Sequence, residues 1–201
     1  MVISFVSIFM ALAIFGALHT LFASTWMKAL TEKRLGLFAR RFYRLFYNLV
    51  SIFTLGVVVW MVFRLPDKGL YTISAPFVFF TFFIQFISAL STLAALAQTG
   101  IKSLLGFEPL FQVEKKVSPK SLTLNGFYRW LRHPAYTFGL LFLWLMPWMT
   151  VNLLAFNLAS TFYILVGIYF EERKLLSEFG EAYDTYRRKT PMLIPPFLIF
   201  K

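Results

Sequence analysis

The sequence predicts an all-α integral membrane protein with about five transmembrane helices, an interfacial amphipathic helix and a short C-terminal cytoplasmic helix. Of its 201 residues, 59% are hydrophobic and only 14% are charged, whereas a soluble domain usually carries roughly 25% charge. Apolar stretches long enough to cross a bilayer as helices recur along the chain. We expect a single transmembrane domain over residues 1–201.

Five apolar segments account for the predicted spans. They cover residues of about 2–24, 43–63, 75–97, 134–150 and 151–170. The first segment lacks a basic start and is longer than the apolar core of a signal peptide, so we expect it to remain as a helix. The last two segments form an apolar hairpin, because residues 147–152 between them carry no charge.

The basic residues orient the chain. Segment 25–44 holds six Lys or Arg side chains against Glu32 alone, and segment 98–133 and the tail are also basic. The positive-inside rule therefore places both loops and the C-terminus in the cytoplasm and the N-terminus outside. Topology and contact with anionic headgroups explain most of the net charge of +11, so we expect no nucleic-acid partner.

Two polar segments are expected to form helices at the membrane surface. Residues 25–42 alternate apolar and basic side chains, which is typical of an interfacial amphipathic helix. After Gly180, the charged tail predicts a short helix with Tyr183 and Tyr186 one turn apart. The longest loop, 99–125, contains glycines and prolines at turn positions and is long enough to have a function.

The first candidate site residues lie at the start of the fourth span. Pro134 suits the first turn of a helix, which places His133 near the N-cap. A helix N-terminus attracts anions, and the planar guanidinium of Arg132 suits a carboxylate. The alternative is that both side chains only anchor the helix at the interface. The chain has no Cys and only two His, so we expect no metal centre.

The second group follows the fifth span. Glu171 and Glu172 are expected to end this helix, where two carboxylates oppose the macrodipole and need a partner. The nearest candidates are Arg132, His133 and Arg173. The pair is either a structural ion pair or a ligand-binding group. Tyr183 and Tyr186 either contact a ligand or lie in the headgroup region.

Two spaced motifs resemble a known family. The residues GFYRWLRHPAY at 126–136 precede an apolar hairpin, and EERKLLSEFGEAYDTYRRKTPMLIP at 171–195 follows it. This arrangement resembles the isoprenylcysteine carboxyl methyltransferase family over about 70 residues. In the first half, GALHTLFAS at 16–24 and YRLFYNLVS at 43–51 resemble the bacterial branch with NnrU-like and methanethiol S-methyltransferase-like relatives, which implies a bacterial inner membrane.

The resemblance implies an S-adenosylmethionine-dependent methyltransferase acting at the cytoplasmic membrane face. The acceptor would be a lipophilic or small molecule carrying a thiol, a carboxylate or a lipid headgroup. A carboxylate acceptor needs no general base, whereas a thiol needs one, for which Glu171, Glu172 and His133 are candidates. The resemblance implies catalytic roles for Arg132 and Glu171, and cofactor contacts from His133, Tyr136, Glu172, Tyr183 and Tyr186.

Two other functions remain open. Membrane sterol reductases share an Arg- or His-Pro helix start and a basic, Tyr-rich tail, and they use NADPH. The Glu171–Glu172 pair disfavours this alternative, because it would repel a phosphate. The other alternative is a non-catalytic NnrU-like membrane protein. His19, near the end of the first span, either faces an acceptor tunnel or forms a contact between helices. The oligomeric state is left open.

Overall fold

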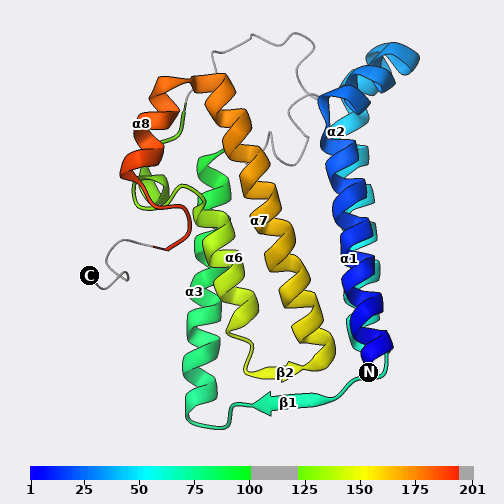
Figure 1. Cartoon of the computed structure of the whole chain (residues 1–201), viewed down its shortest axis with the longest axis vertical. Coiled ribbons are helices and arrows are strands. Elements are labelled where there is room, and N and C mark those ends of the chain that lie inside the picture. Colours follow the sequence, from blue (N-terminus) through cyan, green and yellow to red (C-terminus); the bar gives the residue numbers. More distant parts are fainter. Residues whose placement is uncertain (101–121, 195–201) are drawn as a thin grey trace. The chain divides into compact units, whose positions relative to one another are not determined.

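The computed structural model describes residues 1–100 and 122–194, and helices dominate it (Figure 1). Most of the 99–125 loop lies outside the described residues. By their contacts the residues divide into two compact units. The first contains residues 1–70 and 150–160, and the second contains residues 71–99, 119–149 and 161–201. The single transmembrane domain expected from the sequence stays a prediction.

Within the described residues, four helices are long and apolar enough to cross a membrane. Their outward surfaces carry many exposed Phe, Leu and Ile side chains, as lipid-facing surfaces do. Helices satisfy their own backbone hydrogen bonds, which the bilayer interior requires. The all-α membrane fold predicted from the sequence is therefore confirmed. The four helices are α1 (Val2–Ala23), α2 (Thr25–Arg64), α3 (Phe77–Gln98) and α7 (Val151–Phe179).

In the first unit, α1 and α2 lie side by side (Figure 1) and a polar cluster joins them. Tyr47 Oη lies 2.6 Å from His19 Nε2, and Ser51 Oγ lies 3.0 Å from His19 Nδ1. The Ser51 hydroxyl donates to the Tyr47 carbonyl at 2.8 Å. His19 Nδ1–H must therefore donate to Ser51, while Nε2 accepts from Tyr47. This neutral tautomer satisfies every group, which supports the helix-contact interpretation of His19.

The amphipathic segment is the first part of α2. The Ser24 side chain accepts from Met27 N at 3.2 Å and caps the helix start. Gly36 interrupts the helix with φ +56° and ψ −134°, a conformation that favours glycine. Trp26 and Leu35 before this kink are both more than half exposed. The expected interfacial helix is thus a separate arm of α2, and the spanning part follows from Arg41 to Arg64.

The end of α2 and the start of α7 satisfy each other's backbone groups. The Asn152 amide donates to the carbonyls of Val62 and Leu65 at 3.2 and 3.1 Å. Asp67 Oδ1 in turn accepts from Asn152 N at 3.0 Å. These bonds supply partners to helix ends, whose groups have none within the helix. Asn152 is fully buried, and its hydrogen bonds link the end of α2 to the start of α7.

The second unit contains α3 packed against α6 (Pro134–Trp144). The helix expected over 134–150 ends at Trp144, so it is too short to cross a bilayer alone. Its last carbonyls need partners. The Gln85 amide donates to Phe142 O in the last turn at 2.9 Å, and the Tyr71 hydroxyl donates to Met146 O, just beyond the helix, at 3.2 Å. These long-range hydrogen bonds allow α6 to end at Trp144. The apolar sequence alone gave no sign of this end.

A short strand lies where the fourth span was expected to continue, and it pairs with a strand from an earlier connection. Strand β1 (Gly69–Thr72) pairs with β2 (Trp148–Thr150) (Figure 1). A 3₁₀ helix, η1 (Gly126–Arg129), precedes α6. None of these three elements was predicted from the sequence, because the strands are short and their partners lie far apart in the chain.

Helix α7 extends beyond the expected span end at 170. Its 29 residues measure about 44 Å at 1.5 Å per residue, which exceeds the roughly 30 Å hydrocarbon core. The expectation that Glu171 and Glu172 end this helix was wrong, because it continues to Phe179. The two carboxylates therefore do not face the C-terminal dipole. After Gly180, with φ +56°, the short helix α8 (Glu181–Lys189) confirms the predicted tail helix.

Candidate functional site

The start of α6 is held by the segment that follows α8. Arg132 N donates to Pro191 O at 2.9 Å, and His133 N donates to Met192 O at 3.2 Å. One turn later the Thr137 hydroxyl donates to Leu193 O at 3.0 Å. The tail therefore runs alongside the residues that introduce α6. This pairing fixes the backbone of Arg132 and His133, from which their side chains extend toward α7.

Glu172 on α7 is the partner of both side chains. Its Oε1 lies 2.8 Å from Arg132 Nη1 and 3.1 Å from His133 Nε2. The side chains of Arg132 and Glu172 are 12% and 16% exposed, and that of His133 is 3% exposed. A buried ion pair is costly to break, because the remaining charge loses its compensation. Through these contacts Glu172 holds the residues that introduce α6 next to α7.

Glu171 has a different environment. Its Oε2 accepts a hydrogen bond from the Tyr136 hydroxyl at 3.1 Å and lies 3.8 Å from His133 Nδ1. The side chain of Glu171 is 43% exposed. The adjacent carboxylates thus divide into a paired group, Glu172, and an accessible one, Glu171.

The two ring nitrogens of His133 face different carboxylates. If Nε2 carries the hydrogen that is donated to Glu172 Oε1, Nδ1 is an acceptor that faces the Glu171 carboxylate. Two acceptors at this separation have no hydrogen between them. A ligand carrying a proton or a positive charge is suited to lie beside both groups.

Helix α8 brings its two tyrosines to the same region. Tyr183 is 1% exposed. Burial, followed by the negative charge of Glu172, raises the pKa of Tyr183 to about 12, against the opposing effect of Arg132. The Tyr186 hydroxyl donates to Tyr128 O at 2.6 Å. Burial also raises the pKa of Tyr186. Tyr186 therefore ties α8 to the η1 segment, and its hydroxyl is already engaged.

The cluster offers an accessible carboxylate to a cationic ligand. Glu172 is paired with Arg132 and His133, whereas the side chain of Glu171 is 43% exposed. Arg132 Nε is buried and has no hydrogen-bond partner among residues 1–100 and 122–194. A buried donor of this kind is expensive to leave unpaired. A ligand with a positive centre and a separate acceptor group would satisfy both features.

The sequence-predicted residues come together as follows. Direct contacts join Arg132, His133, Tyr136, Glu171 and Glu172. Tyr183 lies within electrostatic range of this cluster, whereas the hydroxyl of Tyr186 is directed to backbone carbonyls. Their roles toward a ligand stay predictions.

Sequence reasoning missed the residues that hold the site from outside. Gln98 at the end of α3 accepts a hydrogen bond from Phe127 N at 3.3 Å. A Cβ on Gly126, which has φ +62°, would lie 2.6 Å from the Gln98 side chain. The Asn125–Gly126 turn signal was visible in the sequence, but its long-range partner was not. Nothing in the sequence indicated that Thr137 would link α6 to the tail.

The comparisons with known proteins point to methyltransferases. The chain is 44% identical to a methanethiol S-methyltransferase of Crocosphaera subtropica over 86 residues. This matched stretch makes up 43% of this chain and 34% of that protein. A methanethiol S-methyltransferase of Mycobacterium tuberculosis is 46% identical over 68 residues, 34% of this chain and 28% of that protein. A protein-S-isoprenylcysteine O-methyltransferase of Tribolium castaneum is 35% identical over 95 residues, 44% and 32% of the two chains.

The matched segment is similar to methanethiol S-methyltransferases and to a protein-S-isoprenylcysteine O-methyltransferase. The chain spans about a third of the length of the curated relatives it matches. No family model matches the chain, and no solved structure matches it. These similarities agree with the resemblance noted from the two motifs, and they make the cluster around Glu171 the first place to seek a methyl-donor site.

Proposed function

We propose that this protein is a membrane methyltransferase that uses S-adenosylmethionine and acts on a small or lipophilic acceptor. The observation that carries the proposal is the cluster in which Arg132 and His133 pair with Glu172 while the carboxylate of Glu171 stays accessible. The names of the relatives support the reaction class. Bound S-adenosylmethionine supplies an electrophilic methyl group on a positively charged sulfur.

The residues present fit this cofactor. The exposed carboxylate of Glu171 is suited to a cationic or hydroxyl group, and the unpaired Nε of Arg132 is suited to a carboxylate. Glu172 positions Arg132 and His133 and does not itself need to touch the ligand. Tyr136 holds one oxygen of Glu171 at 3.1 Å and leaves the other oxygen to a ligand.

The cluster also contains groups for proton transfer. A thiol becomes a strong nucleophile only as its thiolate, and a nearby base promotes its deprotonation. When His133 donates from Nε2 to Glu172, its Nδ1 is an acceptor and lies 3.8 Å from a second acceptor, Glu171 Oε2. We therefore propose that one of these atoms receives the proton of a thiol acceptor. A carboxylate acceptor would leave both atoms unused.

The proposed chemistry differs from that of a reductase in its charge requirement. NADPH carries phosphates, which the accessible carboxylate of Glu171 repels at short range. A sulfonium is attracted by the same charge. Because Glu171 is 43% exposed, solvent screens its charge, and we expect the carboxylate to act mainly through direct contact with the ligand.

Methyl transfer with a labelled donor tests this proposal. Purified protein in bilayer discs receives S-adenosylmethionine with a labelled methyl group and, separately, a small alkyl thiol, a prenylated carboxylate and a phospholipid amine. We expect the label to appear in one acceptor class and the rate to fall at least roughly tenfold in Glu171→Gln. Binding of NADPH in place of S-adenosylmethionine, or the binding of neither cofactor, would contradict the proposal.

A further inference from the structure

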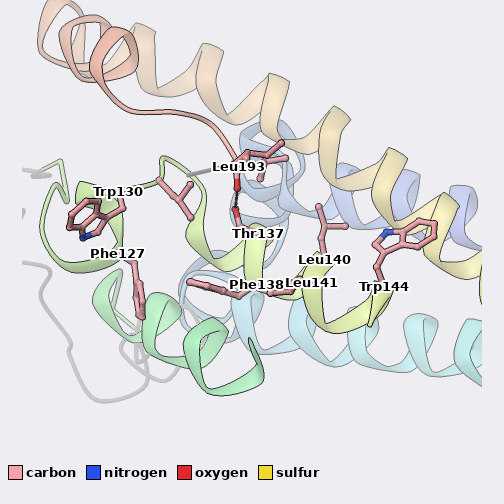
Figure 2. A pocket seen from close by; sticks show the side chains of 10 residues that line it. Phe127, Trp130, Thr137, Phe138, Leu140, Leu141, Trp144 and Leu193 are labelled. Carbon is pink, nitrogen blue, oxygen red and sulfur yellow. Dashed lines mark hydrogen bonds between the residues drawn. The ribbon is translucent and has the colours of Figure 1, made fainter. Parts of the chain in front are cut away.

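A second cavity lies along α6, and its lining residues include neither Tyr136 nor Glu171. It is an apolar groove of about 860 Å³, within the roughly 300–1,000 Å³ that is typical of ligand pockets. Figure 2 shows Trp130 toward one end of the groove and Trp144 at the other, with Leu193 of the tail beside it. All of its lining residues belong to the second unit.

The groove offers almost no polar group to a ligand. Thr137 carries the one hydroxyl among its described lining residues. That hydroxyl already contacts His133 O at 3.1 Å and Leu193 O at 3.0 Å. Trp144 Nε1 donates to Thr161 Oγ1 at 3.0 Å. A polar small molecule would therefore lose its hydration without gaining hydrogen bonds, whereas a hydrocarbon chain would gain contact area.

The length of the groove matches one leaflet of a bilayer. It follows α6, whose 11 residues extend about 16 Å at 1.5 Å per residue. One leaflet contributes about 15 Å of the hydrocarbon core. The end near Trp130 adjoins the charged residues before α6, and the end at Trp144 lies among apolar ones. An acyl chain entering with its headgroup at Trp130 would reach Trp144.

A cation stands at the headgroup end. The guanidinium carbon of Arg129 lies 5.8 Å from the centre of the Trp130 ring, stacked over it. Arg129 is exposed and makes no ion pair within the described parts of the chain. The carboxylate of Glu172 is paired with Arg132 and His133 instead. A phosphate at the surface would supply the anion that Arg129 lacks.

We infer that this groove binds an anionic membrane phospholipid, with one acyl chain along α6 and the phosphate on Arg129. The inference goes beyond the methyl-transfer proposal and does not depend on it. It concerns a lipid site that selects by headgroup. The lipids that merely surround a spanning helix are not selected in this way. Basic positions beside membrane helices favour anionic headgroups by about 1 kcal/mol per Lys or Arg near the surface.

Quenching by brominated lipids tests the site, because bromine on an acyl chain quenches a tryptophan that it touches. One protein keeps only Trp144, with Phe at the other four tryptophans. The matched control keeps only Trp60, which is 59% exposed on α2. Each is placed in phosphatidylcholine bilayers that contain brominated phosphatidylglycerol or brominated phosphatidylcholine.

We expect Trp144 to prefer phosphatidylglycerol by about fivefold and Trp60 to show no preference. Arg129→Gln should remove the preference at Trp144, and Arg129→Lys should retain most of it. Equal quenching of Trp144 by both lipids, or a preference unchanged in Arg129→Gln, would overturn the inference. Equal quenching would leave the groove to another occupant, such as a lipophilic methyl acceptor.

A second measurement avoids the multiple tryptophan substitutions. Native mass spectrometry of the wild-type chain, released from phosphatidylglycerol-containing micelles, should show one retained lipid. Arg129→Gln should reduce the retained fraction severalfold, since Arg129 is exposed and its loss leaves the fold intact. Equal retention by the two proteins would contradict the placement of the phosphate on Arg129.

Discussion

Arg132 Nη1 lies 2.8 Å from Glu172 Oε1, and this ion pair joins the start of α6 to α7. It divides the two adjacent carboxylates of α7 into different roles. Glu172 is enclosed by Arg132 and His133, whereas Glu171 keeps an accessible oxygen. The division leads to predictions that separate folding from ligand binding.

The first prediction compares Glu172→Gln with Glu171→Gln. Removing the charge of Glu172 leaves the buried Arg132 uncompensated, which costs on the order of 1–3 kcal/mol of unfolding free energy. Glu171 is more exposed, so its substitution should change stability little. Thermal unfolding in detergent measures both. If the two variants unfold at the same temperature, the carboxylates do not have separate roles.

The second prediction concerns Arg132→Lys. The ion pair uses Nη1 only, and Nε has no partner in the described structure. Lys can restore the single contact with Glu172 but has no second donor in a planar fork. We expect stability near that of the wild type and a loss of roughly tenfold or more in cofactor affinity.

Calorimetric titration of Arg132→Lys against the wild type provides the measurement. A loss of turnover only at limiting cofactor would place Arg132 on S-adenosylmethionine. A loss at saturating cofactor as well would place it on the acceptor or the transition state. Activity equal to that of the wild type at both concentrations would reduce Arg132 to an anchor at the membrane surface.

The third prediction concerns alkaline pH. The pKa of Tyr183 is raised from 10.0 to about 12 by burial and by the charge of Glu172. Between these values an unfolded chain loses the proton that the folded chain retains, so stability should fall as pH rises from about 10 to 12. Tyr183→Phe should make this decline shallower. Unfolding midpoints at a series of pH values would measure it, and an unchanged slope would contradict the assignment.

The fourth prediction concerns the turn before α6. Gly126→Ala would place a Cβ 2.6 Å from Gln98 and would strain a residue at φ +62°. We expect a loss of about 1–3 kcal/mol in unfolding free energy. Adding Gln98→Ala should recover only the part due to the steric clash, because the strained φ remains. Full recovery in the double variant would show that backbone strain contributes nothing.

Local patterns in the sequence were sufficient to predict much of this architecture. The long apolar segments gave α1, α3 and the spanning parts of α2 and α7, since continuous apolar runs of that length have few alternatives. Gly180 and the charged tail gave α8. The early end of α6 was not predictable, because it depends on distant residues: Gln85 reaches the carbonyl of Phe142 in the last turn, and Tyr71 reaches that of Met146 just beyond it.

The candidate site was predictable in its members but not in its geometry. The sequence indicated the candidate residues because they are polar or charged side chains next to apolar segments: Arg132, His133, Glu171 and Glu172. Their division into paired and accessible groups depends on long-range contacts with Glu171 and Glu172 of α7, and on the tail that holds Arg132 N and His133 N. The early placement of Glu171 at a helix end failed because the polar residues after 170 still form regular helix.

The most direct test of the central claim is calorimetric titration of S-adenosylmethionine into the wild type, Glu171→Gln and Tyr186→Phe in bilayer discs. The hydroxyl of Tyr186 is bound to Tyr128 O, which makes Tyr186→Phe a structural control. We predict saturable binding to the wild type, at least roughly tenfold weaker binding to Glu171→Gln, and affinity within about twofold of the wild type for Tyr186→Phe. No binding to the folded wild type, or equal affinity in Glu171→Gln, would contradict the account.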